Sequence, residues 1–146
     1  MSTDFVHRYG PWALVAGAAV GLGAEYAKQI AARGLSVVLV DRDPGPLEAT
    51  AAATRDASPV EVRPFVLDLA RPDVGDAVLR ATAGLEIGLV VYNAAIGTVA
   101  PFLEMSQANI QAMLDVNCRG PVFLAHALEP AMVARGRGGL IVMSSM

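Results

Sequence analysis

Cysteine, aromatic residues and charged residues are all scarce in this 146-residue sequence, which has one cysteine, 5% aromatic and 17% charged residues. The single cysteine, Cys118, excludes an internal disulfide and a cysteine-rich zinc site; we predict no metal site and a reducing, cytoplasmic location. A net charge of −3 gives no basic surface for a phosphate backbone, so no nucleic acid partner is expected. The apolar stretch 12–24 is interrupted by three glycines and is too short to cross a bilayer, so no membrane segment is expected.

Hydrophobic residues make up 54% of the chain, which is enough for one buried core and excludes general disorder. After a polar leader, short apolar runs alternate with segments of helical period. The predicted strands are 12–16, 36–40, 60–67, 87–92 and 139–144, and the predicted helices cover about 21–33, from 44 onward, 72–82, and from about 106 onward. This alternation predicts an α/β fold with a doubly wound, Rossmann-type parallel sheet in a single domain, residues 1–146. Pro64 places its strand at a sheet edge.

A glycine-rich segment, AGAAVGLGA (16–24), lies between the first strand and the first helix. Its spacing is G-x-x-x-G-x-G, with glycines at 17, 21 and 23. A diphosphate at a helix N-terminus is held by backbone N–H groups, and side chains at the turn would block its approach. The segment therefore favours nucleotide binding. The alternative is a turn of small residues that lets the helix pack closely on the strand.

An acidic residue, Asp41, ends the second strand about 20 residues after the glycines. In that position a carboxylate can accept hydrogen bonds from both hydroxyls of an adenosine ribose and would repel the 2′-phosphate of NADP, which favours NAD. Arg42 leaves NADP open, because its guanidinium could meet that phosphate. A purely structural alternative is that Asp41 caps a turn.

These motifs resemble those of the short-chain dehydrogenases/reductases. The family's T-G-x-x-x-G-[IL]-G signature is matched over 16–23 through Gly17, Gly21, Leu22 and Gly23, with Ala16 in place of threonine. The N-N-A-G that ends the family's fourth strand is matched by Asn93 and Ala94, with Tyr92 and Ala95 as departures. The resemblance implies that these residues bind the cofactor, NAD or NADP, within a sheet of strand order 3-2-1-4-5.

Three further residues take a role from the same resemblance. Asp68, after the third strand, corresponds to the residue that contacts the adenine ring. Ser145, at the end of GGLIVMSS, corresponds to the catalytic serine that polarises the substrate oxygen. Asn117 corresponds to the asparagine of a proton relay. It also falls on the apolar stripe of the long helix, where we expect a buried amide whose alternative role is structural.

The family's catalytic tyrosine and lysine, spaced Y-x-x-x-K, have no counterpart in this sequence. Tyr9, Tyr26 and Tyr92 are followed four positions later by alanine, isoleucine and isoleucine. We therefore expect a C-terminally truncated N-terminal part of the family fold, without its last strands and inactive alone. Loss of a positioned acid typically costs about 10²–10⁴-fold in rate.

The resemblance implies an NAD(P)-dependent oxidoreductase that acts on an alcohol or ketone, and a homodimer or homotetramer at full length. The opening YGPWALV is similar to the hydroxysteroid dehydrogenase and 3-ketoacyl reductase branch, which points to lipid-like substrates. Two alternatives stay open: a non-catalytic nucleotide-binding or regulatory module, and a different Rossmann enzyme such as a methyltransferase. The glycine spacing and the terminal serine strand argue against the methyltransferase.

Overall fold

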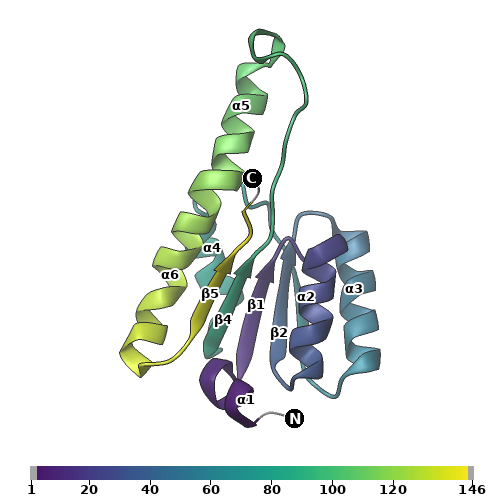
Figure 1. Ribbon diagram of the computed structural model, residues 1–146, viewed down its shortest axis with the longest axis vertical. Coiled ribbons are helices and arrows are strands. Elements are labelled where there is room, and N and C mark those ends of the chain that lie inside the picture. Colours follow the sequence, from purple (N-terminus) through teal and green to yellow (C-terminus); the bar gives the residue numbers. More distant parts are fainter. Residues whose placement is uncertain (1–2, 145–146) are drawn as a thin grey trace.

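Five parallel strands form one twisted sheet at the centre of the molecule (Figure 1). The computed structural model describes residues 3–144. The strands are β1 (Trp12–Ala16), β2 (Ser36–Asp41), β3 (Val62–Val66), β4 (Ile87–Tyr92) and β5 (Gly139–Val142). Their order is β3-β2-β1-β4-β5, which confirms the predicted fold class and strand order.

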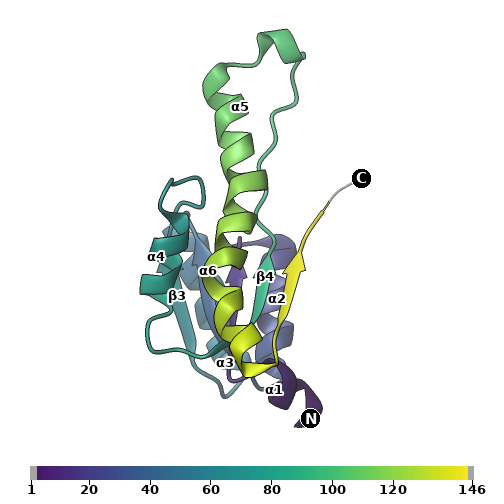
Figure 2. The ribbon, with the colours of Figure 1, turned by 90° about the vertical axis from the view of Figure 1, so that its left-hand side faces the viewer.

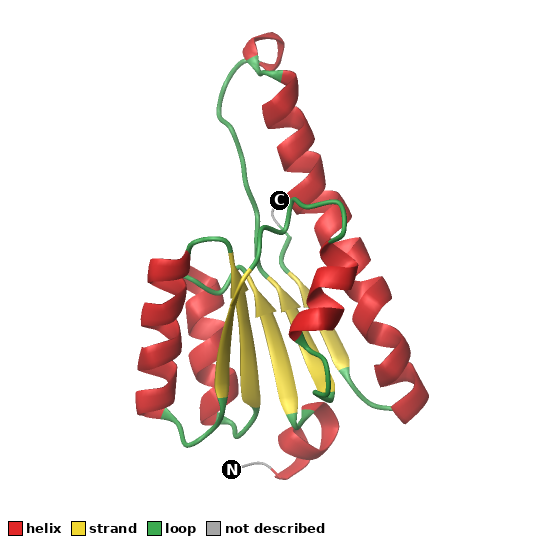
Figure 3. Cartoon of the chain, turned by 180° about the vertical axis from the view of Figure 1, so that it is seen from behind, coloured by secondary structure: helices red, strands yellow, loops and turns green. Residues whose placement is uncertain are grey.

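Helices cover both faces of the sheet, with α2 and α3 on one face and α4 and α6 on the other (Figures 1 and 3). The right-handed twist of parallel strands and their crossovers produces this arrangement. The helical segments are α1 (Thr3–Tyr9), α2 (Gly21–Ala32), α3 (Pro44–Ala57), α4 (Val74–Ala81), the 3₁₀ turn η1 (Phe102–Glu104), α5 (Gln107–Leu114), the π-helical η2 (Asp115–Arg119) and α6 (Gly120–Arg135).

The strand residues alternate between two hydrophobic clusters, one on each face of the sheet. Leu14, Val38 and Val90 pack toward α4 and α6. Val15 and Leu39 belong to the cluster on the opposite face, which includes residues of α2 and α3. Because a strand points successive side chains to opposite faces, a sheet covered on both sides needs the continuous apolar runs seen in the sequence.

The two edges of the sheet differ in how they are protected. β3 is an edge strand, as Pro64 predicts. At the other edge, β5 exposes Leu140 (36%), Ile141 (37%) and Val142 (47%). An apolar edge strand is a template for pairing with another chain.

Two helical features differ from the sequence prediction. The polar leader forms a helix, α1, which lies at the base of the sheet beside the amino ends of the strands (Figure 1). The long helix that begins after Ser106 contains a wide turn, η2, which separates α5 from α6. Figure 2 shows α5 and the loop before it standing beyond the carboxyl ends of the strands.

Candidate functional site

A cavity of about 270 Å³ lies at the carboxyl ends of the strands. Its lining comes from the loops after β1, β2, β3 and β4, because the carboxyl ends of parallel strands meet at one edge of the sheet. Five of the predicted cofactor residues line this cavity together: Gly17, Asp41, Asp68, Asn93 and Ala94.

The glycine loop turns sharply at Gly17, where φ is +80°, a conformation that side chains strongly disfavour. The Gly17 and Ala18 N–H groups both donate to the Val40 carbonyl oxygen, at 2.8 and 3.2 Å. Gly23 lies directly against this turn, since a Cβ atom there would lie 1.8 Å from the Gly17 oxygen. The two glycines therefore let α2 start in contact with the loop.

Gly21 begins α2 with φ of +59° and open space around its Cα. Leu22, next to it, is 62% exposed. The buried face of α2 consists of Gly23, Ala27, Ile30 and Ala31. Gly21, Leu22 and Gly23, which were predicted to bind the cofactor, are not among the residues that line the cavity.

Asp41 holds the glycine loop through its carboxylate. Its Oδ2 accepts the Ala19 N–H at 3.0 Å, and its Oδ1 accepts the N–H groups of Arg42 (2.8 Å) and Asp43 (3.3 Å). From below, the buried Thr50 hydroxyl donates to the Ala19 carbonyl oxygen at 2.7 Å. Asp41 thus caps the turn and lines the cavity at the same time, so the structural and the ligand-binding interpretations are compatible.

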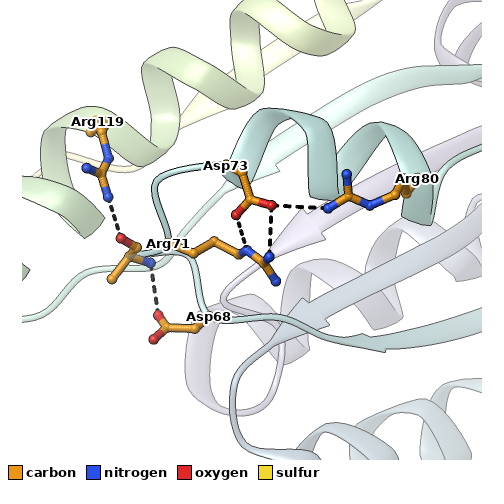
Figure 4. A network of polar contacts seen from close by, with 6 residues as sticks. Asp68, Arg71, Asp73, Arg80 and Arg119 are labelled. Carbon is orange, nitrogen blue, oxygen red and sulfur yellow. Dashed lines mark hydrogen bonds and ion pairs between the residues drawn. The ribbon is translucent and has the colours of Figure 1, made fainter.

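Asp68 lies on the loop between β3 and α4, which a network of polar contacts fastens (Figure 4). Asp68 Oδ1 accepts the Ala70 N–H at 2.9 Å, and Arg119 of η2 donates to the Ala70 carbonyl oxygen. Farther along, Asp73 pairs with Arg71 and Arg80. The hydrogen bond from Arg71, with a further one from Arg80, lowers the pKa of Asp73 to about 2.

Asn93 and Ala94 join the end of β4 to the glycine loop. Asn93 Nδ2 donates to the Gly17 carbonyl oxygen at 3.1 Å. The backbone N–H groups of both residues donate to the Ala16 carbonyl oxygen, at 2.9 and 3.2 Å. The Asn93 side chain therefore fixes the tight turn. Gly17 packs directly against the backbone of Ala94, where a Cβ on Gly17 would not fit.

Asn117 is exposed and lies in η2, so the expectation of a buried amide is wrong. The prediction assumed that the apolar stripe is covered along its whole length, whereas α5, directly before η2, has no buried residue and stands beyond the carboxyl ends of the strands (Figure 2). Its side chain clamps the backbone of Ile96: Oδ1 accepts the Ile96 N–H at 2.9 Å and Nδ2 donates to the Ile96 carbonyl oxygen at 2.8 Å. Because Ile96 lines the cavity, Asn117 supports the site from outside.

Sequence reasoning missed several residues that line or support the site. Ile96 and Val116 line the cavity, and nothing in their type distinguishes them from core residues. Tyr92, noted only as a departure from the family pattern, is 2% exposed and donates a hydrogen bond of 2.6 Å to the Val116 carbonyl oxygen. The signal available was a large polar side chain ending a fully apolar strand.

Ser145 lies outside the described residues. Within residues 3–144, no group of histidine, cysteine, aspartate and glutamate side chains is arranged to hold a metal ion. None of the helices in that same range has the length and apolar character needed to cross a membrane.

Comparison with known proteins identifies relatives across nearly the whole chain. The sequence is 31% identical over 140 residues to a human very-long-chain 3-oxoacyl-CoA reductase, covering 93% of this chain and 45% of that protein. A solved structure of a 7β-hydroxysteroid dehydrogenase superposes with a TM-score of 0.93 at 30% identity, covering 97% of this chain and 56% of the other. A solved structure of a short-chain dehydrogenase from Sphingobium yanoikuyae in complex with NADPH superposes with a TM-score of 0.87 at 34% identity. The match covers 94% of this chain and 54% of the other.

The chain thus spans about half the length of the relatives it matches. Over this part, the sequence model of the short chain dehydrogenases matches residues 11–146. The glycine loop and the cavity at the carboxyl edge lie within this matched region, and the chain belongs to the short-chain dehydrogenase family.

Proposed function

We propose that this chain binds a nicotinamide dinucleotide in the cavity at the carboxyl edge of the sheet, as the cofactor-binding part of an alcohol or ketone oxidoreductase. The observation that carries the proposal is the convergence of Gly17, Asp41, Asp68 and Asn93 on one cavity beside the start of α2. A cofactor diphosphate fits beside the N-terminus of α2, where Gly17 lines the cavity with backbone that no side chain covers. A bound nicotinamide supplies the hydride that reduces a carbonyl carbon, or accepts one from an alcohol.

The residues take separate roles in this proposal. Backbone N–H groups at the start of α2 bind the diphosphate, Asp41 binds the adenosine ribose, and Asp68 borders the adenine. Asn117 and Ser145 belong to the substrate end, with Ser145 polarising the substrate oxygen and Asn117 serving the proton relay. Because the 146 residues contain no Tyr-x-x-x-Lys pair, this polypeptide alone is expected to bind the cofactor without turnover.

Asp41 and Arg42 together govern the choice between NAD and NADP. Asp41 favours NAD by charge repulsion. Two observations favour NADP(H): Arg42 is exposed at the cavity, and the relative from Sphingobium yanoikuyae was solved with NADPH. We propose that the chain accepts NADP(H) through Arg42. The substrate class is an alcohol or ketone of lipid-like character, in keeping with the acyl-CoA and steroid relatives.

Fluorescence titration of the purified chain with NADPH and with NADH tests these assignments. Saturable binding is expected, and Asp41→Ala should weaken NADH more than NADPH, because it removes the contact with the ribose and, for NADPH, also removes the repulsion of the 2′-phosphate. Asp56→Ala, which removes an equal charge from the exposed side of α3, is the matched control and should leave binding unchanged. Arg42→Ala should weaken NADPH more than NADH. Equal binding by the Asp41→Ala and Asp56→Ala variants would contradict the proposed site.

A further inference from the structure

Tyr92 ends β4 in a position where the resembling family has an asparagine. Its ring is buried in the hydrophobic cluster on the face of the sheet that α4 and α6 cover, with an exposed fraction of 2%. The hydroxyl donates to the Val116 carbonyl oxygen at 2.6 Å, which joins the end of β4 to the wide turn η2 across 24 residues of sequence. A side chain of this size at the carboxyl end of a central strand requires an explanation beyond filling space.

The Val116 carbonyl needs a donor from outside its own helix. In an α-helix the N–H four residues later would serve it, but the Gly120 N–H donates to the Asp115 oxygen instead, as the π turn requires. Five residues later stands Pro121, which has no N–H. Val116 is 5% exposed, and a buried carbonyl is normally paired. The Tyr92 hydroxyl supplies the hydrogen bond that Gly120 and Pro121 do not.

The start of α6 leaves space for the Tyr92 hydroxyl. A Cβ atom at Gly120 would lie 2.2 Å from the Tyr92 hydroxyl oxygen, so only glycine leaves room. Burial raises the pKa of Tyr92 above its usual value, so the hydroxyl keeps its proton and stays a donor at every physiological pH. Tyr92, Gly120 and Pro121 therefore form one matched set.

The carbonyl that Tyr92 bonds belongs to Val116, one residue before the amide that supports the site. Asn117 follows Val116 and clamps the backbone of Ile96 with two hydrogen bonds, and both Val116 and Ile96 line the cavity. We propose that Tyr92 is a positioning residue of the nucleotide site: its hydroxyl locks the π turn so that Asn117 holds the Ile96 wall of the cavity. This proposal rests on the proposed function, because it assigns Tyr92 a role in cofactor binding.

A double-mutant cycle tests whether Tyr92 acts through Asn117. Tyr92→Phe keeps the ring and removes only the hydroxyl, and it should weaken NADPH binding about fivefold, the effect of losing one typical hydrogen bond. In an Asn117→Ala background the same change should have no further effect. Tyr26→Phe, which removes the hydroxyl of a partly buried tyrosine on α2, is the control and should bind as the unaltered chain does. Equal weakening by Tyr92→Phe in both backgrounds would overturn the proposal.

Hydrogen exchange at the Ile96 amide reports the same coupling without cofactor. Asn117 Oδ1 accepts this N–H, so Tyr92→Phe should speed its exchange, whereas Tyr26→Phe should not. If the unaltered chain bound no NADPH, the proposed function would fail while this measurement still decided the role of Tyr92. Unchanged exchange at Ile96 would overturn that role.

A rescue variant covers the case in which Tyr92→Phe unfolds the chain. Pro121→Ala restores an N–H five residues after Val116, where the wide turn can use it. The Tyr92→Phe/Pro121→Ala chain should therefore regain the folded state and slow exchange at Ile96. Failure of the second substitution to recover either would contradict the hydrogen-bond argument.

Discussion

Replacing Gly23 by alanine should destabilise the fold strongly, although Gly23 lies in a helix where alanine is intrinsically preferred. The added Cβ would lie 1.8 Å from the Gly17 oxygen and 2.9 Å from Asn93 Nδ2, both closer than real Cβ contacts. Gly17 cannot retreat easily, because its N–H is bonded to the Val40 oxygen at 2.8 Å. The clash is with backbone and not with the end of a flexible side chain.

The magnitude follows from two opposing effects. Alanine gains about 1 kcal/mol of helix propensity over glycine. Overpacking typically costs about 1–3 kcal/mol, and a clash with backbone lies at the upper end of that range, so we expect a net loss of about 2 kcal/mol. For a chain of this size, that corresponds to a fall in melting temperature of about 4–8 °C. NADPH binding should also be lost, because the loop would be displaced from α2.

Two other glycines give matched comparisons in the same thermal melt. Gly45, near the start of α3, has nothing within 4 Å of an added Cβ, so Gly45→Ala should be neutral or slightly stabilising. Gly21 also has open space, but its φ of +59° makes Gly21→Ala cost about 1–2 kcal/mol from conformation alone. A melting temperature of Gly23→Ala equal to that of Gly45→Ala would refute the steric reasoning.

Three further outcomes are expected. The pKa of Asp73 in the folded chain is lowered from an ordinary 3.8 to about 2, so the stability that this carboxylate contributes is present above pH 3.8 and is lost as the pH falls toward 2. The melting temperatures of the unaltered chain and of Asp73→Asn should therefore converge between pH 3.8 and 2. A constant difference would count against the pairing with Arg71. Ser106→Ala should cost about 1 kcal/mol in denaturant unfolding, because the serine oxygen accepts the Asn109 N–H at 3.1 Å at the start of α5; no loss would show that this cap contributes nothing. Ile141→Lys should reduce self-association measured by light scattering, because it places a charge on the exposed apolar edge strand β5. Unchanged self-association would show that the chains associate through another surface.

The sequence alone was sufficient for the strands and most helices. Continuous apolar runs such as 36–40 have no exposed face, so they belong to a sheet covered on both sides, and Pro64 excludes its strand from the centre. A glycine directly after a helix, such as Gly34 with φ of +95°, is a local feature of the same kind. These features depend on residue type and neighbours along the chain, which is the information that a sequence carries.

Tertiary structure decided which polar residues meet. Asn117 was expected on a buried stripe, but α5 directly before it has no buried residue, and the amide meets the backbone of Ile96, 21 residues away in the sequence. Asp41 was predicted either to cap a turn or to face a ligand, and it does the first while lining the cavity.

The residues by themselves determined the order of strands and helices and the glycine loop, because backbone conformation and burial are dictated locally. Only the folded chain determined how the loops after four strands close around one cavity, and how Tyr92 supports its wall. That closure depends on hydrogen bonds between residues far apart in sequence, such as Asn93 with Gly17 and Asn117 with Ile96. Such pairs become neighbours only when the parallel strands align their carboxyl ends.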